Sequence, residues 1–162
     1  NLLPRSIEGL RLLQDHYLIV MITNQSAVAR GLLTEKELLS IHKTLTARLS
    51  RSDVLVDAIY ACPHHPTAGR HPYRRQCRCR KPQPGMLLQA SVDFDIPLAA
   101  SVAIGDKASD ISAAQRAGVP VTVLVNSPKT NSYPKPDVEP THTTDSLYQA
   151  AQWILNLQAE SR

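Results

Sequence analysis

Aromatic residues and long apolar runs are scarce in this sequence. Phe, Trp and Tyr make up 4% of the 162 residues, so we expect an aliphatic core. No apolar run approaches the length of about twenty residues that a membrane helix needs. The chain also shows no secretion or lipidation signal. These absences favour a cytoplasmic protein without a membrane partner.

The rest of the composition is typical of a globular protein. Apolar residues make up 43% of the chain and charged residues 20%, and the net charge is +4. A positive charge of this size is compatible with an anionic small molecule or with nucleic acid. The length predicts one domain that covers residues 1–162.

Cysteine is also rare: the chain has three, all within residues 62–81. An odd count without a secretion signal disfavours disulfides. The cysteines and a histidine form two close pairs, and this spacing predicts a structural zinc site with three thiolates and one imidazole. The predicted ligands are Cys62, His64, Cys77 and Cys79. The spacing favours His64 as the histidine ligand and leaves His65 and His71 as alternatives.

Basic residues surround the last two cysteines: Arg74, Arg75, Arg78, Arg80 and Lys81. They have two interpretations. Three thiolates around Zn²⁺ carry a net negative charge, which the arginines would neutralise. Alternatively, zinc stiffens this loop and directs Arg80 and Lys81 toward an anion. Arginine binds phosphate with its forked guanidinium, and lysine acts as a point charge.

The apolar pattern predicts alternating helices and strands. The predicted helices cover residues 4–14, 33–49, 86–92, 109–117 and about 146–158, and the predicted strands cover residues 18–22, 54–61, 101–104 and 119–125. Thr34 and Glu37 have the spacing of a capping box, Gly118 is a predicted helix C-cap, and residues 127–145 are expected to form a loop. This alternation predicts an α/β fold with a doubly wound, mainly parallel sheet.

Polar residues stand at three separate places where ligands of such folds bind, beyond the carboxyl ends of strands. They are Thr23 with Asn24, Arg80 with Lys81, and Asp106 with Asp110. A hydroxyl can hold phosphate oxygens, a lysine can neutralise developing charge, and a carboxylate can bind Mg²⁺. Taken singly, these residues could be a turn, a solvated lysine and a helix cap. Together they indicate phosphoryl transfer.

The same residues carry a family resemblance. Thr23-Asn24-Gln25-Ser26 after an apolar strand, Arg80-Lys81-Pro82, and Gly105-Asp106-Lys107-x-x-Asp110 resemble three motifs of the haloacid-dehalogenase phosphatases. Residues 62–81, called the zinc loop below, and the sequence Thr-Asn-Gln-Ser-Ala-Val-Ala-Arg-Gly at 23–31 resemble segments of the D-glycero-D-manno-heptose-1,7-bisphosphate 7-phosphatases. The related histidinol-phosphate phosphatases typically have a shorter zinc loop and lack the Ala-Arg-Gly continuation. The resemblance extends from residue 3 to about residue 125.

The resemblance implies a role for each motif residue. Thr23 would stabilise the transferring phosphoryl group, and Lys81 would hold that group and the nucleophile in place. The other implied roles are substrate binding for Asn24, Gln25, Ser26, Arg80 and Lys107, magnesium binding for Asp106, and support of this arrangement for Asp110. The implied cofactors are Mg²⁺ and Zn²⁺.

One family motif is absent from these residues: the Asp-x-Asp-Gly-Thr of the first strand. In the family its first Asp attacks phosphorus and its second acts as general acid and base. The chain begins with Asn1 and a helical pattern, so we expect this motif upstream. Its strand would lie between those ending at Thr23 and Gly105. Ala27 also replaces the usual Gly, which is harmless if the backbone there has a negative φ.

Three hypotheses for function follow. The leading one is a monomeric, Mg²⁺-dependent phosphatase that removes the 7-phosphate of D-glycero-D-manno-heptose 1,7-bisphosphate through an aspartyl-phosphate intermediate. It would have no nucleic-acid partner and would serve lipopolysaccharide biosynthesis or another heptose-containing glycan. A second hypothesis keeps the mechanism and changes the substrate to histidinol phosphate or another small phosphomonoester. The third is a non-catalytic, zinc-stabilised module that binds sugar phosphates or nucleic acid through its basic loop. The absent nucleophile favours this module, whereas a magnesium-binding Asp106 favours an enzyme.

Overall fold

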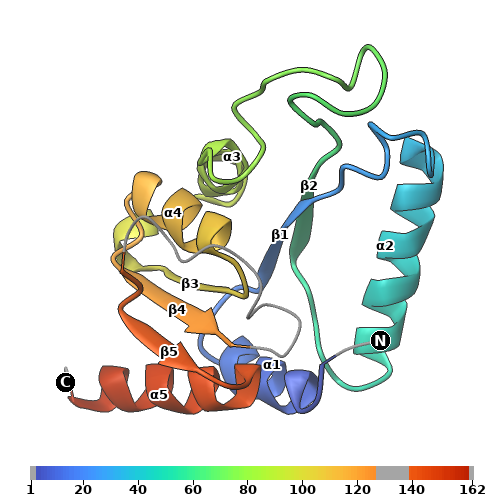
Figure 1. Cartoon of the computed structure of the whole chain (residues 1–162). Coiled ribbons are helices and arrows are strands. Elements are labelled where there is room, and N and C mark those ends of the chain that lie inside the picture. Colours follow the sequence, from blue (N-terminus) through green and yellow to red (C-terminus); the bar gives the residue numbers. More distant parts are fainter. Residues whose placement is uncertain (1–2, 127–138, 161–162) are drawn as a thin grey trace.

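The computed structural model describes residues 3–126 and 139–160, in which helices and parallel strands alternate (Figure 1). The elements are α1 (Ser6–Gln14), β1 (Val20–Asn24), α2 (Glu35–Ser50), β2 (Ala58–Cys62), α3 (Gly85–Phe94), a 3₁₀ turn (Leu98–Ala100), β3 (Val102–Gly105), α4 (Ala108–Arg116), β4 (Val121–Val125), β5 (His142–Thr144) and α5 (Leu147–Glu160). All strand pairs are parallel. The predicted α/β fold class is confirmed.

The strands form two parallel sheets in the part of the chain that the structure describes. One has the order β1-β2, with Val20 opposite Ala58 and Asn24 opposite Cys62. The other has the order β3-β4-β5. Within the described residues, the second edges of β1 and β3 therefore have no partner strand. These are the two edges that the sequence predicted on either side of the absent first strand.

Several predicted element boundaries were wrong. The strand predicted over 18–22 is observed over Val20–Asn24: Leu18 is 56% exposed, while Thr23 and Asn24 continue the ladder opposite β2. The strand predicted over 54–61 begins only at Ala58, because the N–H of Val54 donates to the Leu49 carbonyl at the end of α2.

The loop predicted over 127–145 was wrong at His142–Thr144, which form β5 beside β4. This short strand carries little periodicity of its own. Its position depends on tertiary contacts: the His142 ring stacks on Trp153 of α5, with ring centroids 4.3 Å apart. Residues 127–138 of that prediction lie outside the described residues.

The buried residues of one apolar core cluster are all aliphatic, as predicted from the scarcity of aromatic residues. It joins α1, β4 and α5 through Leu13, Val123, Val125, Ala150, Ala151 and Ile154. Trp153 of α5 packs against this cluster. No helix among residues 3–126 and 139–160 is long and apolar enough to span a membrane.

Local sequence signals correctly predicted the start of α2 and the end of α4. The predicted capping box of α2 is present, because the Thr34 hydroxyl accepts the Glu37 N–H while the Glu37 carboxylate accepts the Thr34 N–H. Gly118 follows α4 with φ of +87°, as a C-terminal glycine requires. Ala27 is not among the described residues with positive φ, so its replacement of glycine is not strained.

Candidate metal centre and active site

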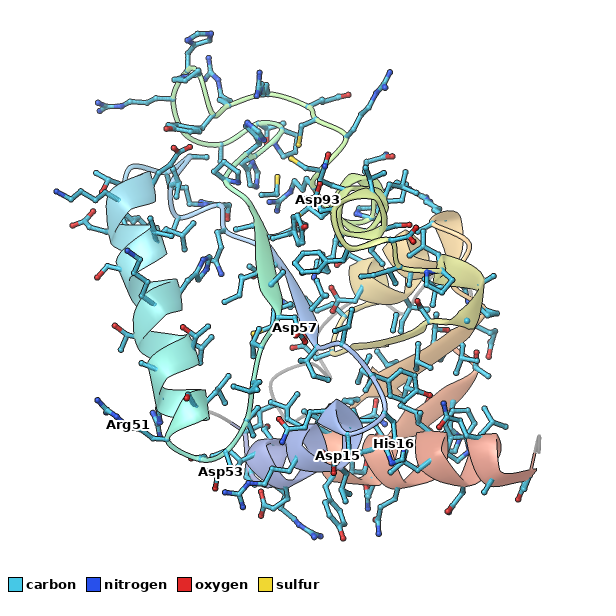
Figure 2. The ribbon with its side chains drawn as sticks, turned by 180° about the vertical axis from the view of Figure 1, so that it is seen from behind. Asp15, His16, Arg51, Asp53, Asp57 and Asp93 are labelled. Atoms are coloured by element: carbon cyan, nitrogen blue, oxygen red, sulfur yellow. The ribbon has the colours of Figure 1, made fainter. Side chains whose placement is uncertain are left out.

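The end of β2 and the following loop bring four metal-ligating side chains together: Cys62, His64, Cys77 and Cys79. Their ligand atoms all lie within 4.8 Å of one another. The Sγ atoms are 3.0 to 3.5 Å apart, and His64 Nδ1 is 3.3 Å from the Cys79 Sγ. Three sulfurs and one imidazole nitrogen at this spacing fit tetrahedral Zn²⁺. Sulfur atoms (yellow) gather at this end of β2 in Figure 2.

The histidine ambiguity of the sequence is resolved by the geometry. The His65 ring is not part of the cluster, because its Nδ1 accepts hydrogen bonds from the N–H groups of Thr67 and Ala68. His71 is also not in the cluster. Burial, and next the neighbouring Arg75, lower the pKa of His64, which favours the neutral imidazole that a metal needs. In the absence of metal, burial and the Cys79 thiol raise the pKa of Cys62.

The cluster is hydrogen-bonded to both flanking motifs. The N–H of Gln25 donates to the Cys62 carbonyl at 2.7 Å, which ties the cluster to the end of β1. Arg80 Nη1 donates to the His64 carbonyl at 2.9 Å. A metal that fixes residues 62–64 and 77–79 would therefore also hold Gln25 and Arg80 in place.

Lys81 links the two sheets. Its Nζ donates to the Ile22 carbonyl of β1 at 2.7 Å and pairs with Asp110 of α4 at 2.5 Å. The Lys81 side chain is only 12% exposed, so it is not the solvated surface lysine that the sequence allowed as an alternative. It lies beside the unpaired edge of β1 and contacts Asn24 of that strand and Asp110 of α4.

Thr23 and Gln25 meet at the end of β1. Gln25 Nε2 donates to the Thr23 hydroxyl at 2.9 Å. A hydroxyl has one proton to donate besides its acceptor capacity, so the Thr23 proton stays available for an anion. Ser26 follows in a turn, where its carbonyl accepts the N–H of Arg30 at 3.0 Å.

The end of β3 supplies the acidic group. Asp110 Oδ2 accepts the N–H groups of Asp106 and Lys107, and its Oδ1 pairs with Lys81. Gly105 permits this approach, since a Cβ there would lie 2.2 Å from the Asp110 Cβ. Burial, and next the charge of Asp110, raise the pKa of Asp106. A desolvated carboxylate beside a second one fits a divalent cation, so Asp106 would hold Mg²⁺.

The zinc loop folds back onto the segment after β1, a contact that the sequence analysis missed. The N–H of Arg70 donates to the Ala29 carbonyl at 3.0 Å. Gly69 has φ of +89°, and a Cβ there would lie 1.9 Å from the Ala29 oxygen, so only glycine fits. The glycine at position 69 inside the zinc loop is the sequence feature from which this close approach could have been predicted.

Positive charge gathers around this contact. The pKa of His65 is lowered by burial, then by Arg80, then by Arg30. Both guanidinium groups therefore act electrostatically on the same imidazole although they come from different loops. No acidic residue occurs between Asp57 and Asp93, which Figure 2 labels near β2 and α3. The zinc loop therefore contains no carboxylate that would neutralise the basic residues with which an anion could pair.

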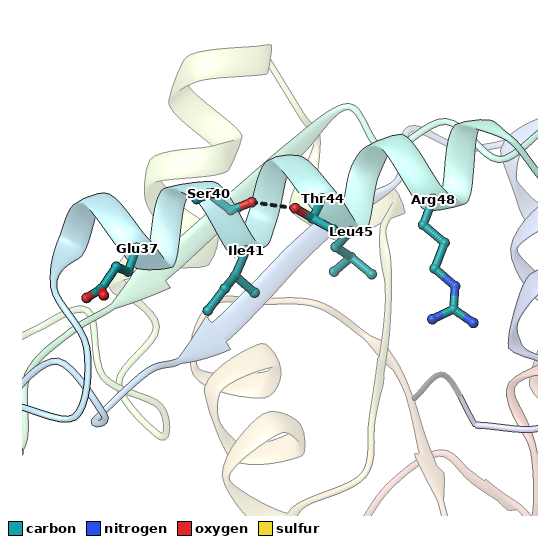
Figure 3. A pocket seen from close by; sticks show the side chains of 6 residues that line it. All are labelled: Glu37, Ser40, Ile41, Thr44, Leu45 and Arg48. Atoms are coloured by element: carbon teal, nitrogen blue, oxygen red, sulfur yellow. Dashed lines mark hydrogen bonds between the residues drawn. The ribbon is translucent and has the colours of Figure 1, made fainter.

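A separate groove of about 460 Å³ runs along α2 (Figure 3). It is lined by Glu37, Ser40, Ile41, Thr44, Leu45 and Arg48. All six lie on one helix, and the groove contains none of the candidate site residues that the sequence predicted. It therefore lies apart from the candidate active site.

Comparison with known proteins points in the same direction. Residues 78–150 match a family model described as HAD-hydrolase-like. A D-glycero-beta-D-manno-heptose-1,7-bisphosphate 7-phosphatase from Yersinia pestis is 39% identical over 144 residues, which cover 89% of this chain and 70% of that protein. The protein of the same name from Photorhabdus laumondii is 44% identical over 113 residues, which cover 70% of this chain and 60% of that protein.

A solved structure extends the similarity to the fold. It is the D,D-heptose 1.7-bisphosphate phosphatase from B. bronchiseptica, complexed with magnesium and phosphate. It matches with a TM-score of 0.77 at 36% identity, and the match covers 96% of this chain and 84% of that chain.

Proposed function

This chain belongs to the D-glycero-β-D-manno-heptose-1,7-bisphosphate 7-phosphatase family of haloacid-dehalogenase-like phosphatases, and we propose that it takes part in the same reaction. The reaction is removal of the 7-phosphate from D-glycero-D-manno-heptose 1,7-bisphosphate. The substrate is a small sugar phosphate, and we further propose a cytoplasmic monomer that has no nucleic-acid partner.

One observation carries the proposal: Lys81 contacts β1 next to Thr23 and α4 at Asp110, four residues after Asp106. Three motifs that are far apart in the sequence therefore meet through one ammonium group. A non-catalytic sugar-phosphate module would not need a desolvated Asp106 suited to a divalent cation. This argues for the enzyme over the binding module.

Each residue would have a defined task in that reaction. The Thr23 hydroxyl would donate to a phosphoryl oxygen, and Lys81 would neutralise the charge that develops on it. Asp106 would hold Mg²⁺, which supplies further charge stabilisation when bound. Lys107, Gln25 and Ser26 would line the pocket, and Asp110 would keep Lys81 and the start of α4 in position.

Arg80 would recognise the second phosphate of a bisphosphate. Its guanidinium is anchored on the His64 carbonyl, and like that of Arg30 it lowers the pKa of His65. Two cations carried by the loops that follow Thr23 and precede Lys81 would favour a substrate with two phosphates over histidinol phosphate. The zinc loop carries Arg80 and packs on the backbone of Ala29, next to Arg30 in the chain.

The attacking aspartate is not among the described residues near this site. We propose that it lies on a strand between the unpaired edges of β1 and β3, which is where the family resemblance puts it. Unpaired N–H and C=O groups cost about 1–3 kcal/mol each when they are buried. A strand at that place would therefore supply the nucleophile and also stabilise the two sheets.

The experiment is a phosphate-release assay on the 162-residue chain and on the protein translated from its full coding sequence. We expect activity with Mg²⁺ only when an Asp-x-Asp strand is present, with a higher kcat/KM for the heptose bisphosphate than for histidinol phosphate. The reverse preference would move the assignment to the histidinol-phosphate alternative. Hydrolysis by the 162 residues alone would show that the nucleophile is misplaced.

Variants of the neighbouring Lys81 and Arg80 test the site itself. Lys81→Ala should lower kcat by roughly 100- to 1000-fold, since removal of one preorganised charge costs about 3–4 kcal/mol. Arg80→Ala should mainly raise KM for the bisphosphate. If both variants turned over at the wild-type rate, the basic loop would not belong to the active site.

A further inference from the structure

Asn24, the last residue of β1, makes a reciprocal contact with the backbone of Lys81. Its Oδ1 accepts the Lys81 N–H at 3.0 Å, and its Nδ2 donates to the Lys81 carbonyl at 3.1 Å. One side-chain amide thus satisfies both backbone groups of a residue that is 57 positions away in the chain. Two hydrogen bonds from one planar amide restrain both the position and the orientation of that residue, which a single hydrogen bond would not do.

The other end of Lys81 is held by the same strand. Lys81 Nζ donates to the carbonyl of Ile22, two residues before Asn24 in β1. Ile22 faces the unpaired edge of β1, where the proposed first strand would take its carbonyl. The contacts that this strand would leave in place are the two Asn24 bonds to the Lys81 backbone and the ion pair with Asp110. Together they fix the backbone of Lys81 at one point and its ammonium group at another.

We propose that Asn24 is a positioning residue, which sets the place of the Lys81 ammonium group by clamping the Lys81 backbone. This inference rests on the proposed function, in which Lys81 neutralises the phosphoryl group. It assigns the Asn24 side chain a task other than substrate binding. A misplacement of about 1 Å at a reacting group can cost roughly 100-fold in rate, so the clamp matters although it lies behind the lysine.

The alternative is a direct contact between Asn24 and substrate. The side-chain amide has two N–H groups and two acceptor positions, and the clamp uses one of each. A double-mutant cycle separates the two roles, because a residue that acts only through Lys81 has no effect once Lys81 is removed.

The cycle uses Asn24→Ala, Lys81→Ala and the double variant in the zinc-loaded, full-length protein, with heptose bisphosphate and Mg²⁺. Asn24→Ala is expected to lower kcat by about 10- to 100-fold with KM within about threefold of the wild type. The double variant is expected to match Lys81→Ala within about twofold. The matched control is Asn126→Ala, an exposed asparagine after β4, which should leave kcat unchanged.

A second measurement does not depend on activity. Hydrogen exchange at the Lys81 N–H of the zinc-loaded chain should accelerate at least about tenfold in Asn24→Ala and stay unchanged in Asn126→Ala. Asn24→Asp keeps the acceptor for that N–H and loses the donor to the carbonyl. It should retain more of the protection than Asn24→Ala does, provided that zinc is still bound.

The outcomes are distinct. Wild-type kcat in Asn24→Ala, or a double variant about tenfold slower than Lys81→Ala, would overturn the positioning role and leave the proposed function standing. Wild-type kcat in Lys81→Ala would instead overturn the proposed function, and this inference with it. Unchanged exchange at the Lys81 N–H in Asn24→Ala would contradict the clamp even if kcat fell.

Discussion

The sheet of β3, β4 and β5 packs on α1 and α5 through apolar side chains, whereas the sheet of β1 and β2 has few buried residues. Val123 of β4 and Ile154 of α5 are at most 1% exposed. Every residue of β1 is partly exposed, and in β2 only Cys62 is fully buried. The two sheets are therefore stabilised by different interactions.

The chemistry is concentrated on the less apolar side. The metal cluster follows β2, the Asn24 clamp ends β1, and Lys81 crosses to α4. Polar side chains can be held in place without a large apolar core when metal ligation and paired hydrogen bonds replace it. The consequence is that perturbing one side should leave much of the other intact. Two experiments test this, and a third measures a local contact on α2.

Loss of zinc should have the largest effect, and only on the β1–β2 side. His64→Asn should remove the metal and accelerate hydrogen exchange over residues 62–81, because a structural zinc contributes about 10–16 kcal/mol of apparent binding free energy in zinc-finger peptides. The matched control is His65→Asn, which leaves the four ligands in place and should retain zinc. Metal analysis measures the loss of zinc, and hydrogen exchange in β4 and α5 shows whether the effect stays on the β1–β2 side.

Equal zinc loss in the His64 and His65 variants would contradict the proposed ligand set. Faster exchange in β4 and α5 after zinc removal would show that the two sides unfold together.

A core truncation should have the next largest effect, on the opposite side. Ile154→Ala should lower the free energy of unfolding by about 2–5 kcal/mol, because it opens a cavity between α5 and β4. Zinc content should stay at the wild-type value. Val92→Ala is the control: this side chain is 78% exposed and its loss should change stability by less than about 0.5 kcal/mol. Thermal melts and metal analysis of the two variants test this, and zinc loss in Ile154→Ala would refute independent sides.

The smallest effect is expected from the cap of α2. Thr34→Ala should cost about 1 kcal/mol of stability. Thr44→Ala is the control, since its hydroxyl bonds only to the Ser40 carbonyl within the helix.

The capping contact also has a pH dependence of known sign. The Thr34 N–H and hydroxyl lower the pKa of Glu37. A lowered carboxyl pKa stabilises the folded chain above the unfolded pKa, and this contribution is lost as the pH falls through the folded value. The cost of Thr34→Ala, measured by denaturant unfolding, should therefore shrink in acid. A cost independent of pH would mean that the box does not close in solution.

Local sequence signals predicted much of the architecture. The capping box of α2, the helix stop at Gly118 and the alternation of elements depend on near neighbours in the chain, and all three were correct. The predicted boundaries of β1 and β2 were wrong, and β5 was predicted as a loop. A strand forms where a partner strand pairs with it, and its own residues do not specify that partner.

The sequence by itself determined the metal cluster, since two close ligand pairs on one loop can reach a common ion almost regardless of the surrounding fold. It also determined the three polar motifs and their order. Only the tertiary structure decided that His64 rather than His65 joins the cluster, that Gly69 brings the loop onto Ala29, and that Asn24 holds Lys81. These contacts join residues many positions apart, and the geometry that selects them exists only once β1, β2 and α4 are packed in place.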